Sequence, residues 1–225
     1  MGPSRGKTLD IGKIGLRRDD LPPLGERPQQ SRFDFRRWFQ DVGPDDPLEL
    51  EIGSGKGTFL VQQAAAHRHV HYVGIEYAHK FWKYAADRCR RHGLENVRLI
   101  HEDARVLIDW YAADEIFTQT HVYFPDPWPK KRHHKRRLLC ESFFLQMHRV
   151  LVPGGVIRIV TDHEDYFQWI VEHAGRVADR FEVIPFTTAL SHDSAGEMAG
   201  TNFERKYRRE GRPFHATGLR KIDSH

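Results

Sequence analysis

The sequence predicts an α/β fold built on a mostly parallel sheet with helices on both faces. Two observations support this prediction. Short apolar runs alternate with helical stretches of about 10–15 residues between residues 48 and 185, which is typical of parallel sheets. Acidic residues also stand in or just after five successive predicted strands, at the sheet edge where ligands of such folds bind.

The first half of the chain predicts three strand–helix pairs. Leu48–Ile52 is a short apolar strand with interleaved acids, and the helix Thr58–Ala66 follows it after a glycine-rich turn. The other predicted elements are strands at 71–76 and 97–100 and helices at 79–93 and 104–111. Before them, the aromatic stretch 31–40 is expected to form a short helix that docks onto the body.

The second half continues the alternation. Strands are predicted at 118–124, 156–160 and 181–185, and helices at 137–151 and 165–176. We expect Pro153-Gly154-Gly155 to stop the first of these helices. Residues 187–200 are small and polar and predict a flexible loop.

The ends of the chain predict its domain organisation. We expect a flexible basic N-terminal arm at 1–30, a single domain at 31–218 and a C-terminal tail at 219–225. No apolar run of about 18 residues and no signal peptide is present, which argues against a membrane protein. Cys89 and Cys140 are far apart, so we expect reduced thiols in a cytoplasmic protein and no metal site.

Charge is distributed unevenly along the chain. The net charge is +4, but residues 130–137 alone carry +6. Residues 1–40 and 204–221 are also basic, so the rest of the chain is acidic. Basic segments on an acidic body are typical of a protein that binds a polyanion, although solvated surface cations would give the same pattern at 130–137.

A glycine-rich turn follows the first predicted strand. It contains Gly53, Gly55 and Gly57, whose spacing is not that of a dinucleotide-binding fingerprint or a Walker A loop. Nineteen residues further on, Glu76 is placed to accept hydrogen bonds from two ribose hydroxyls, which fits NAD or S-adenosylmethionine. Acids at Glu51 and Asp103 favour S-adenosylmethionine, because it carries cationic groups and no phosphate.

The stretch 121–137 combines an acid with a block of cations. Asp126 stands between Pro125 and Pro127, directly after the predicted strand 118–124. Prolines restrict the backbone and hold such an acid in a fixed turn. We therefore expect a reaction pocket beside a polyanion. Trp128 either stacks on a base or packs under the loop.

With these motifs, the chain resembles the bacterial tRNA (guanine-N7)-methyltransferases, a class I S-adenosylmethionine-dependent family. The resemblance covers residues 31–218 and is carried by the motifs at 50–57, 124–137 and 201–204. It implies a Rossmann-like fold with a seven-stranded, mostly parallel sheet. It also implies methyl transfer from S-adenosylmethionine to N7 of guanosine 46 in the tRNA variable loop, by a monomer or homodimer.

The resemblance assigns roles by position. Asp126 is implied to be catalytic and to share the cofactor site with Glu51, Gly53, Gly55, Gly57, Glu76 and Asp103. The implied substrate-binding residues are Lys130, Asp162, Thr201, Asn202, Phe203 and Glu204. The remaining cations are expected to bind RNA phosphates, namely Lys131, Arg132, His133, Lys135, Arg136 and Arg137. Asn202 departs from the family, which usually has a basic residue there.

Three alternative functions are compatible with parts of this pattern. An amine methyltransferase of rRNA or DNA usually has Asn or Asp, two prolines and then an aromatic residue after the fourth strand. Here Pro127 is followed by Trp128 and then Pro129, which breaks that pattern. A nonenzymatic RNA-binding protein on the same fold would be expected to lose the cofactor acids. A dehydrogenase is possible on fold alone, but an acidic pocket does not suit a dinucleotide.

Guanine N7 offers a lone pair and no proton, so its methylation needs no base to generate the nucleophile. Asp126 could therefore hold the guanine through its N1–H and N2–H₂ donors, or stabilise the positive charge that builds on the purine. We expect orientation to be its main role.

Overall fold

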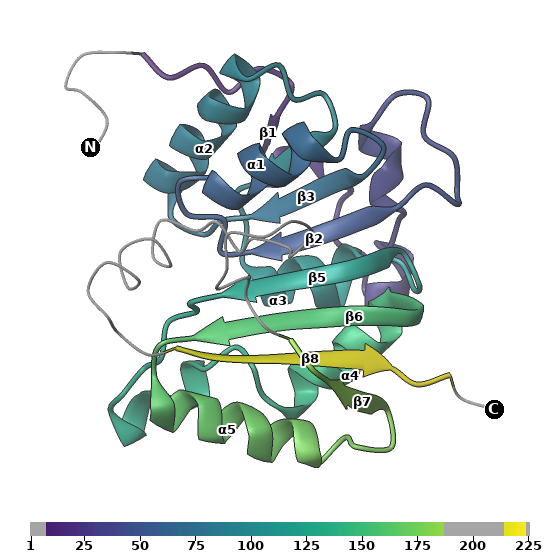
Figure 1. Cartoon of the computed structure of the whole chain (residues 1–225). Coiled ribbons are helices and arrows are strands. Elements are labelled where there is room, and N and C mark those ends of the chain that lie inside the picture. The colour runs from purple at the N-terminus through teal and green to yellow at the C-terminus, as the bar shows by residue number, and fades with distance from the viewer. Residues whose placement is uncertain (1–7, 187–213, 224–225) are drawn as a thin grey trace. The chain divides into compact units, whose positions relative to one another are not determined.

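The computed structural model describes residues 8–186 and 214–223. The chain forms two compact units, Met1–Ala113 and Asp114–His225, each with its own strands and helices (Figure 1). Eight strands lie within the described residues, four in each unit, where seven were expected. The predicted α/β class with mostly parallel strands is confirmed.

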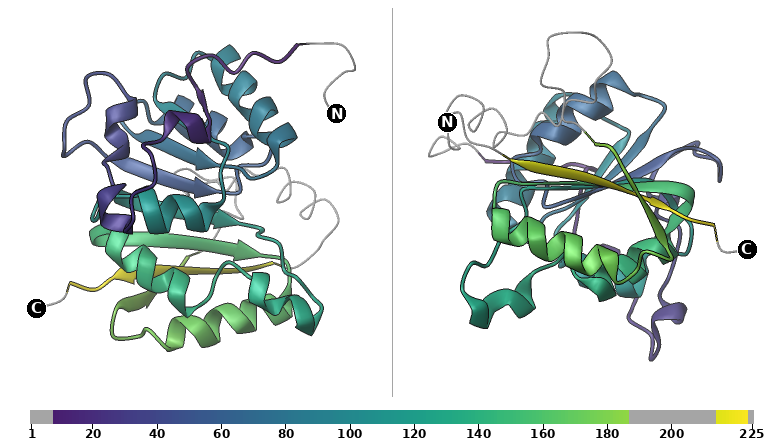
Figure 2. Two further views of the ribbon diagram at one scale, coloured as in Figure 1. Left: turned by 180° about the vertical axis from the view of Figure 1, so that it is seen from behind. Right: turned by 60° about the horizontal axis from the view of Figure 1, so that its bottom comes forward.

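The first unit contains four parallel strands in the order β1-β4-β3-β2. They are β1 (Gly15–Leu16), β2 (Leu48–Ile52), β3 (His71–Ile75) and β4 (Val97–Ile100). Helices α1 (Thr58–Ala66) and α2 (His79–Arg91) pack against each other on one face (Figure 1). The short α3 (Ala104–Val106) continues as a π-helical turn, Leu107–Tyr111, and comes to the front when the structure is seen from behind (Figure 2).

The central strands of this unit are covered on both sides. All five residues of β2 are buried, including the acids Glu49 and Glu51. In β3, a Cβ on Gly74 would lie 2.2 Å from the Leu99 side chain and 2.8 Å from Leu60. A larger residue at this position would force these two leucine side chains, from helix α1 and strand β4, to shift within the core.

The N-terminal segment requires a correction. Residues 8–30 were expected to belong to an irregular arm, but Gly15–Leu16 pairs in parallel with β4. Ile14 and Leu21 are buried, and Arg18 forms an ion pair with Glu102 at 2.9 Å. Two apolar anchors and one short strand suffice to dock the segment, although its glycines and prolines hide any periodicity. The aromatic stretch 31–40 forms a short 3-10 helix, Phe35–Trp38, in which the rings of these two residues stack at 4.5 Å.

The second unit contains a mixed set of strands in the order β5-β6-β8-β7. Strands β5 (Phe117–Tyr123) and β6 (Leu151–Thr161) are parallel, whereas β8 (His215–Lys221) is antiparallel to both β6 and β7 (Phe181–Ile184). Helices α4 (Glu141–Val150) and α5 (Glu164–Gly175) pack against each other (Figure 2). A 3-10 helix, η5 (Lys131–Arg136), lies between β5 and α4.

Two predicted boundaries in this unit are wrong. The helix expected at 137–151 begins at Glu141 and ends at Val150, because Leu151 already pairs with Phe117 as the first residue of β6. Pro153-Gly154-Gly155 therefore lies inside a strand, at an irregularity where the pairing with β5 shifts register. Gly154 takes a positive φ of 70° there, which glycine adopts without strain.

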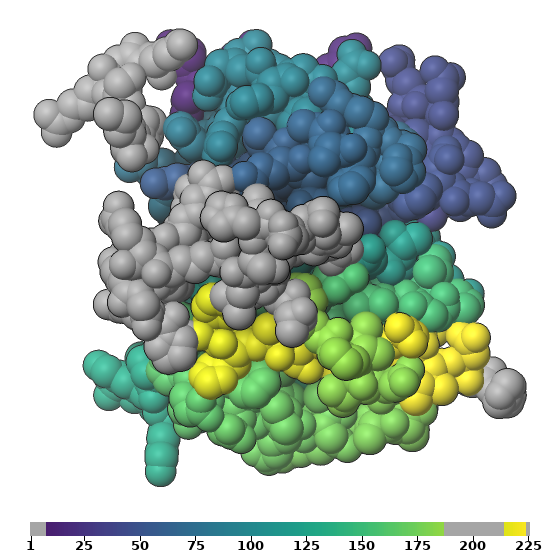
Figure 3. Space-filling model, in the orientation of Figure 1, coloured from purple at the N-terminus to yellow at the C-terminus, as the bar shows by residue number. Residues whose placement is uncertain are grey.

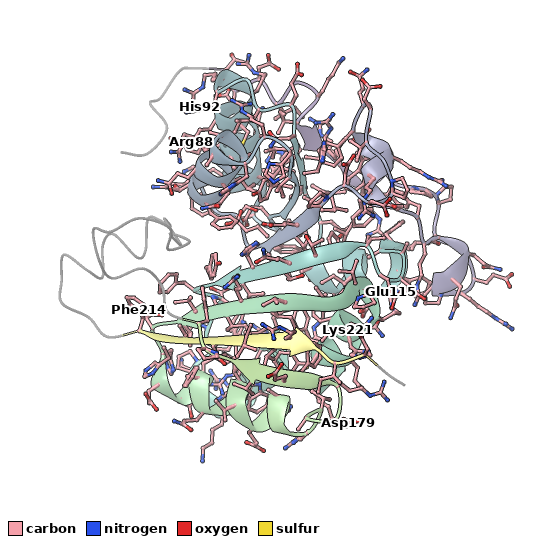
Figure 4. All side chains as sticks on the ribbon, turned by 45° about the vertical axis from the view of Figure 1, so that its right-hand side comes forward. Arg88, His92, Glu115, Asp179, Phe214 and Lys221 are labelled. Atoms are coloured by element: carbon pink, nitrogen blue, oxygen red, sulfur yellow. The ribbon has the colours of Figure 1, made fainter. Side chains whose placement is uncertain are left out.

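Strand β8 was not predicted, and it crosses the expected boundary at residue 218. Its last residue, Lys221, is buried and donates hydrogen bonds to Glu115 at 2.9 Å and to the Leu151 carbonyl at 2.8 Å. Figure 4 shows the Lys221 and Glu115 side chains approaching each other. Residues 219–221 of the expected tail are thus part of the fold. The predicted loop at 187–200 lies outside the described residues.

Candidate active site

The glycine-rich turn after β2 takes a conformation that only glycine adopts readily. Gly53, Gly55 and Gly57 have φ values of 79°, 53° and 67°. A Cβ on Gly53 would meet no atom of the described residues within 4 Å, and one on Gly55 only the Gly53 carbonyl at 3.9 Å. Among the described residues, no atom therefore fills the space beside Gly53, and only a backbone carbonyl approaches that beside Gly55. Gly57 differs, because a Cβ there would lie 2.9 Å from the Ala85 side chain of α2.

The turn is held by contacts from two neighbouring elements. The Gly53 N–H donates to the carbonyl of Ile75 at 2.8 Å, and the Gly55 N–H donates to Glu76 Oε2 at 2.7 Å. From α2, Arg88 donates to the Lys56 carbonyl at 3.2 Å and to Thr58 Oγ1 at 2.9 Å (Figure 4 labels Arg88). The turn is thus preorganised by the fold.

Glu51 is the most perturbed acid of the first unit. Its side chain lies in β2, only 4% of the residue is exposed, and Oε2 is buried without a hydrogen-bond partner among the described residues. Its pKa is raised from 4.5 to about 8, mainly by burial and to a smaller extent by the nearby charge of Glu76. A buried acceptor without a donor is costly, so this oxygen is suited to receive a cationic or hydrogen-bonding ligand.

Glu76 and Asp103 close the same edge of the first unit. Glu76 is 9% exposed, and its Oε1 accepts from the Ala78 N–H at 2.7 Å. Each of its oxygens uses one acceptor position on backbone amides, which leaves further positions for ligand hydroxyls. Asp103 is the N-cap of α3, and its Oδ1 accepts from the Arg105 N–H at 2.8 Å. All three acids of this unit stand at the carboxyl ends of parallel strands, as predicted.

A cavity of the first unit lies at the opposite edge. It has a volume of about 560 Å³ and is lined by Phe39, His71 and Arg98, among others, which stand before or at the start of β2, β3 and β4. It is therefore separate from the glycine turn and its acids.

In the second unit, Asp126 occupies an exposed turn directly after β5. The turn is bordered by two residues other than glycine with positive φ, Phe124 at 52° and Trp128 at 44°. The Phe124 N–H donates to the Val160 carbonyl of β6 at 2.7 Å, which fixes the start of the turn. Asp162, which follows β6, is also exposed.

The cationic block after this turn forms η5 and lies at the surface of the second unit (Figure 3). Its exposed residues are Lys130, Lys131, Arg132, Lys135 and Arg136. His133 and His134 are half-buried. The guanidinium of Arg136 lies over the Trp128 ring at 4.9 Å, and the His133 ring meets Trp128 edge-on at 5.9 Å. Trp128 therefore packs within its own loop, one of the two alternatives for this residue.

Arg137 was predicted to bind RNA, but the structure buries its side chain. The residue is 1% exposed, so its guanidinium is not at the surface with the other cations of the block. Its Nε donates to the Pro127 carbonyl at 2.9 Å, and its guanidinium forms an ion pair with Asp165 and lies over the rings of Tyr166 and Trp169. The sequence shows a run of six cations but not which of them turns inward.

Some functional assignments cannot be placed in the structure. Thr201, Asn202, Phe203 and Glu204 lie outside the described residues. Two structural contributors, Arg88 and Gly74, were not singled out by the sequence. The Arg88 position on α2, thirty residues after Thr58, carries no local motif, and Gly74 is an isolated glycine in a strand, a pattern that signals close backbone approach.

No helix of the described residues is both long and apolar enough to cross a membrane. Over the same residues, no group of three or more histidines, cysteines or acids is arranged to hold a metal ion.

Residues 45–217 match the methyltransferase family model Methyltransf_4, described as "Putative methyltransferase". The tRNA (guanine-N(7)-)-methyltransferase of Lactococcus lactis subsp. cremoris is 31% identical over 81% of this chain and 84% of its own length. That of Geobacillus kaustophilus is 33% identical over 78% of this chain and 79% of its own length.

The chain belongs to the tRNA (guanine-N(7)-)-methyltransferase family. It is a methyltransferase with the Rossmann-like fold of the class I enzymes. The structure of the 16S rRNA methyltransferase KamB is similar to it with a TM-score of 0.58, 14% identity and coverage of 80% of this chain and 90% of that chain. At that identity the likeness supports the fold alone.

Proposed function

We propose that this methyltransferase transfers a methyl group from S-adenosylmethionine to N7 of guanosine 46 in the variable loop of tRNA. The observation that carries the proposal is family membership over most of the chain, since the relatives named above are tRNA (guanine-N(7)-)-methyltransferases. The geometry of each unit agrees with it. The first unit offers an acidic edge beside a glycine turn, and the second offers an acid in a rigid turn beside exposed cations.

The first unit fits the cofactor. S-adenosylmethionine, when bound, supplies an activated methyl group on a positively charged sulfur. Glu51 would compensate cationic charge with its unpartnered buried oxygen. Glu76 would accept from ribose hydroxyls and Asp103 would take a further polar contact, while Gly53 and Gly55 leave room for the ligand beside the backbone.

The second unit fits the acceptor. Guanine N7 carries its own lone pair, so Asp126 need not remove a proton. We assign Asp126 to hold the guanine through its N–H donors and to stabilise the charge that builds on the purine. Its turn is fixed by Pro125 and Pro127, so little ordering entropy is lost when the base binds. The exposed cations of the block at 130–136 would bind tRNA phosphates.

The test uses the full chain, radiolabelled S-adenosylmethionine and unmodified tRNA transcripts. We expect label in 7-methylguanosine at position 46, and no label in a transcript that carries adenosine there. Label on another nucleoside or at another position would contradict the proposal. Asp126→Asn should reduce turnover strongly while tRNA binding stays unchanged, and near-normal turnover of this variant would remove Asp126 from its assigned role.

A further inference from the structure

Arg137 links the turn that carries Asp126 to helix α5. On one side, Arg137 Nε donates to the Pro127 carbonyl at 2.9 Å, one residue after Asp126. On the other side, the guanidinium forms an ion pair with Asp165 and lies 5.0 and 5.2 Å from the ring centres of Tyr166 and Trp169. Arginine suits this role because its planar group donates in several directions and stacks on aromatic rings at the same time.

The chain that follows Arg137 is also fastened to α5. The Leu139 N–H donates to Tyr166 Oη at 3.1 Å, and Trp169 Nε1 donates to the Leu139 carbonyl at 2.9 Å. The Glu141 N–H donates to His173 Nδ1 at 3.1 Å. Residues 137–141 are therefore anchored by three bonds that do not involve the guanidinium. Loss of the Arg137 side chain leaves this anchor in place and releases mainly the Pro127 carbonyl.

The turn itself needs such a support. Phe124 and Trp128 both take a positive φ, which is unfavourable for large residues and persists only where the surroundings hold it. The bond from Phe124 to Val160 holds the start of the turn. The bond from Arg137 holds the Pro127 carbonyl directly before Trp128, and Arg136 covers the Trp128 ring. Asp126 lies between these two supported points.

We propose that Arg137 is a positioning residue that fixes the Pro125–Trp128 turn and thereby holds Asp126 in its working orientation. The inference rests on the proposed function for the role of Asp126, but not for the geometry of the turn. The proposal gives the cations at 130–136 and Arg137 different roles. The residues at 130–136 are exposed or half-buried, whereas Arg137 is buried and supports the turn that carries Asp126.

The test compares Arg137→Lys with two other variants. Lysine keeps the charge, but it cannot bind the Pro127 carbonyl and Asp165 while also stacking on the two aromatic rings. We expect kcat to fall by about 10- to 100-fold, because displacement of a reacting group by about 1 Å has an effect of that size. KM for tRNA and for S-adenosylmethionine should stay within about threefold, since the exposed cations and the first unit are intact.

Asp165→Ala and Arg176→Met are the matched variants. Asp165→Ala removes the α5 partner and keeps the bond to Pro127, so its kcat should fall much less than that of Arg137→Lys. Arg176→Met removes an exposed arginine that pairs with Glu172 at the end of α5 and should leave kcat unchanged. Equal losses of kcat in Asp165→Ala and Arg137→Lys would mean that α5 docking alone matters, which overturns the proposal.

Hydrogen exchange provides a readout that is independent of activity. In Arg137→Lys, the amides of Asp126 and Trp128 should exchange faster, while those of β6 stay protected. Unchanged exchange in the turn, or a loss of tRNA affinity with a reduced salt dependence, would contradict a positioning role. Because exchange is measured without substrate, this result stands even if the wild-type protein methylates another nucleoside. If Arg137→Lys fails to fold, hydrogen exchange in Asp165→Ala decides. Wild-type exchange rates in the Pro125–Trp128 turn of this variant support the proposal, and faster exchange there contradicts it.

Discussion

The pKa of Glu51 provides a quantitative prediction about the cofactor side of the site. Burial raises it from 4.5 to about 8, so the folded protein holds a proton that the unfolded chain releases near pH 4.5. Each pKa unit corresponds to about 1.36 kcal/mol, so ionised Glu51 destabilises the folded state by up to about 5 kcal/mol. This cost is absent below about pH 4.5, grows as the pH rises, and is complete above about pH 8.

Glu51→Gln removes this titration and keeps the shape of the side chain. At pH 5 the variant and the wild type should have similar free energies of unfolding. At pH 8.5 the variant should be more stable by several kcal/mol, because it has no carboxylate to ionise in the core. Urea denaturation at both pH values measures the difference, and Glu49→Gln in the same strand controls for loss of one carboxylate from β2.

A stability difference between wild type and Glu51→Gln that is the same at pH 5 and pH 8.5 would contradict a raised pKa for Glu51. A second measurement connects the effect to ligand binding. Saturating S-adenosylhomocysteine, which retains an ammonium group, should lower the pKa of Glu51 by pairing with its charged form. The wild type should then gain more stability from this ligand at pH 8.5 than Glu51→Gln does. Equal gains would place the ammonium away from Glu51.

Three further predictions concern packing and RNA binding. Gly74→Ala should destabilise the protein by about 1–3 kcal/mol in urea denaturation, because its Cβ would overlap a leucine side chain of β4; an unchanged denaturation midpoint would contradict the close approach. Lys221→Met should cost about 1–3 kcal/mol, since it leaves the Leu151 carbonyl without its donor, and a smaller loss in Glu115→Gln would assign the effect to that carbonyl. Replacing Lys131 and Lys135 together by glutamine should lower the slope of log Kd for tRNA against log salt by about 1–2, and an unchanged slope would remove both from the phosphate contacts.

The sequence predicted elements well where local signals agree with the tertiary structure. The strand Leu48–Ile52 and the helix Thr58–Ala66 were confirmed at both ends, because an apolar run, a glycine turn and a helical run follow one another there. It failed at Gly15–Leu16 and at His215–Lys221, which are held mainly by pairing with distant strands. In β8 only Leu219 is an apolar residue with nearly complete burial among seven, so no alternation marks the strand.

The same contrast holds for the candidate site. Position after a strand correctly placed Glu51, Glu76 and Asp103 at one edge of the first unit, because parallel strands present their carboxyl ends together. Position alone could not show that Glu51 Oε2 is buried without a hydrogen-bond partner among the described residues, while Glu76 accepts two backbone hydrogen bonds. That difference depends on helices and turns that pack over the strands. It determines for which acid ionisation is unfavourable in the folded protein.

The difference in burial suits Asp126 and Glu51 to different roles. Asp126 is exposed in its turn, so water and ligand compete for it and its usefulness depends on orientation, which the buried Arg137 supports from behind. Glu51 is inside the fold, where no solvent competes and ionisation is unfavourable until a cation arrives. A ligand cation at Glu51 would therefore offset the unfavourable free energy of the ionised carboxylate in the folded protein. A guanine at Asp126 gains most from a carboxylate that is already in place.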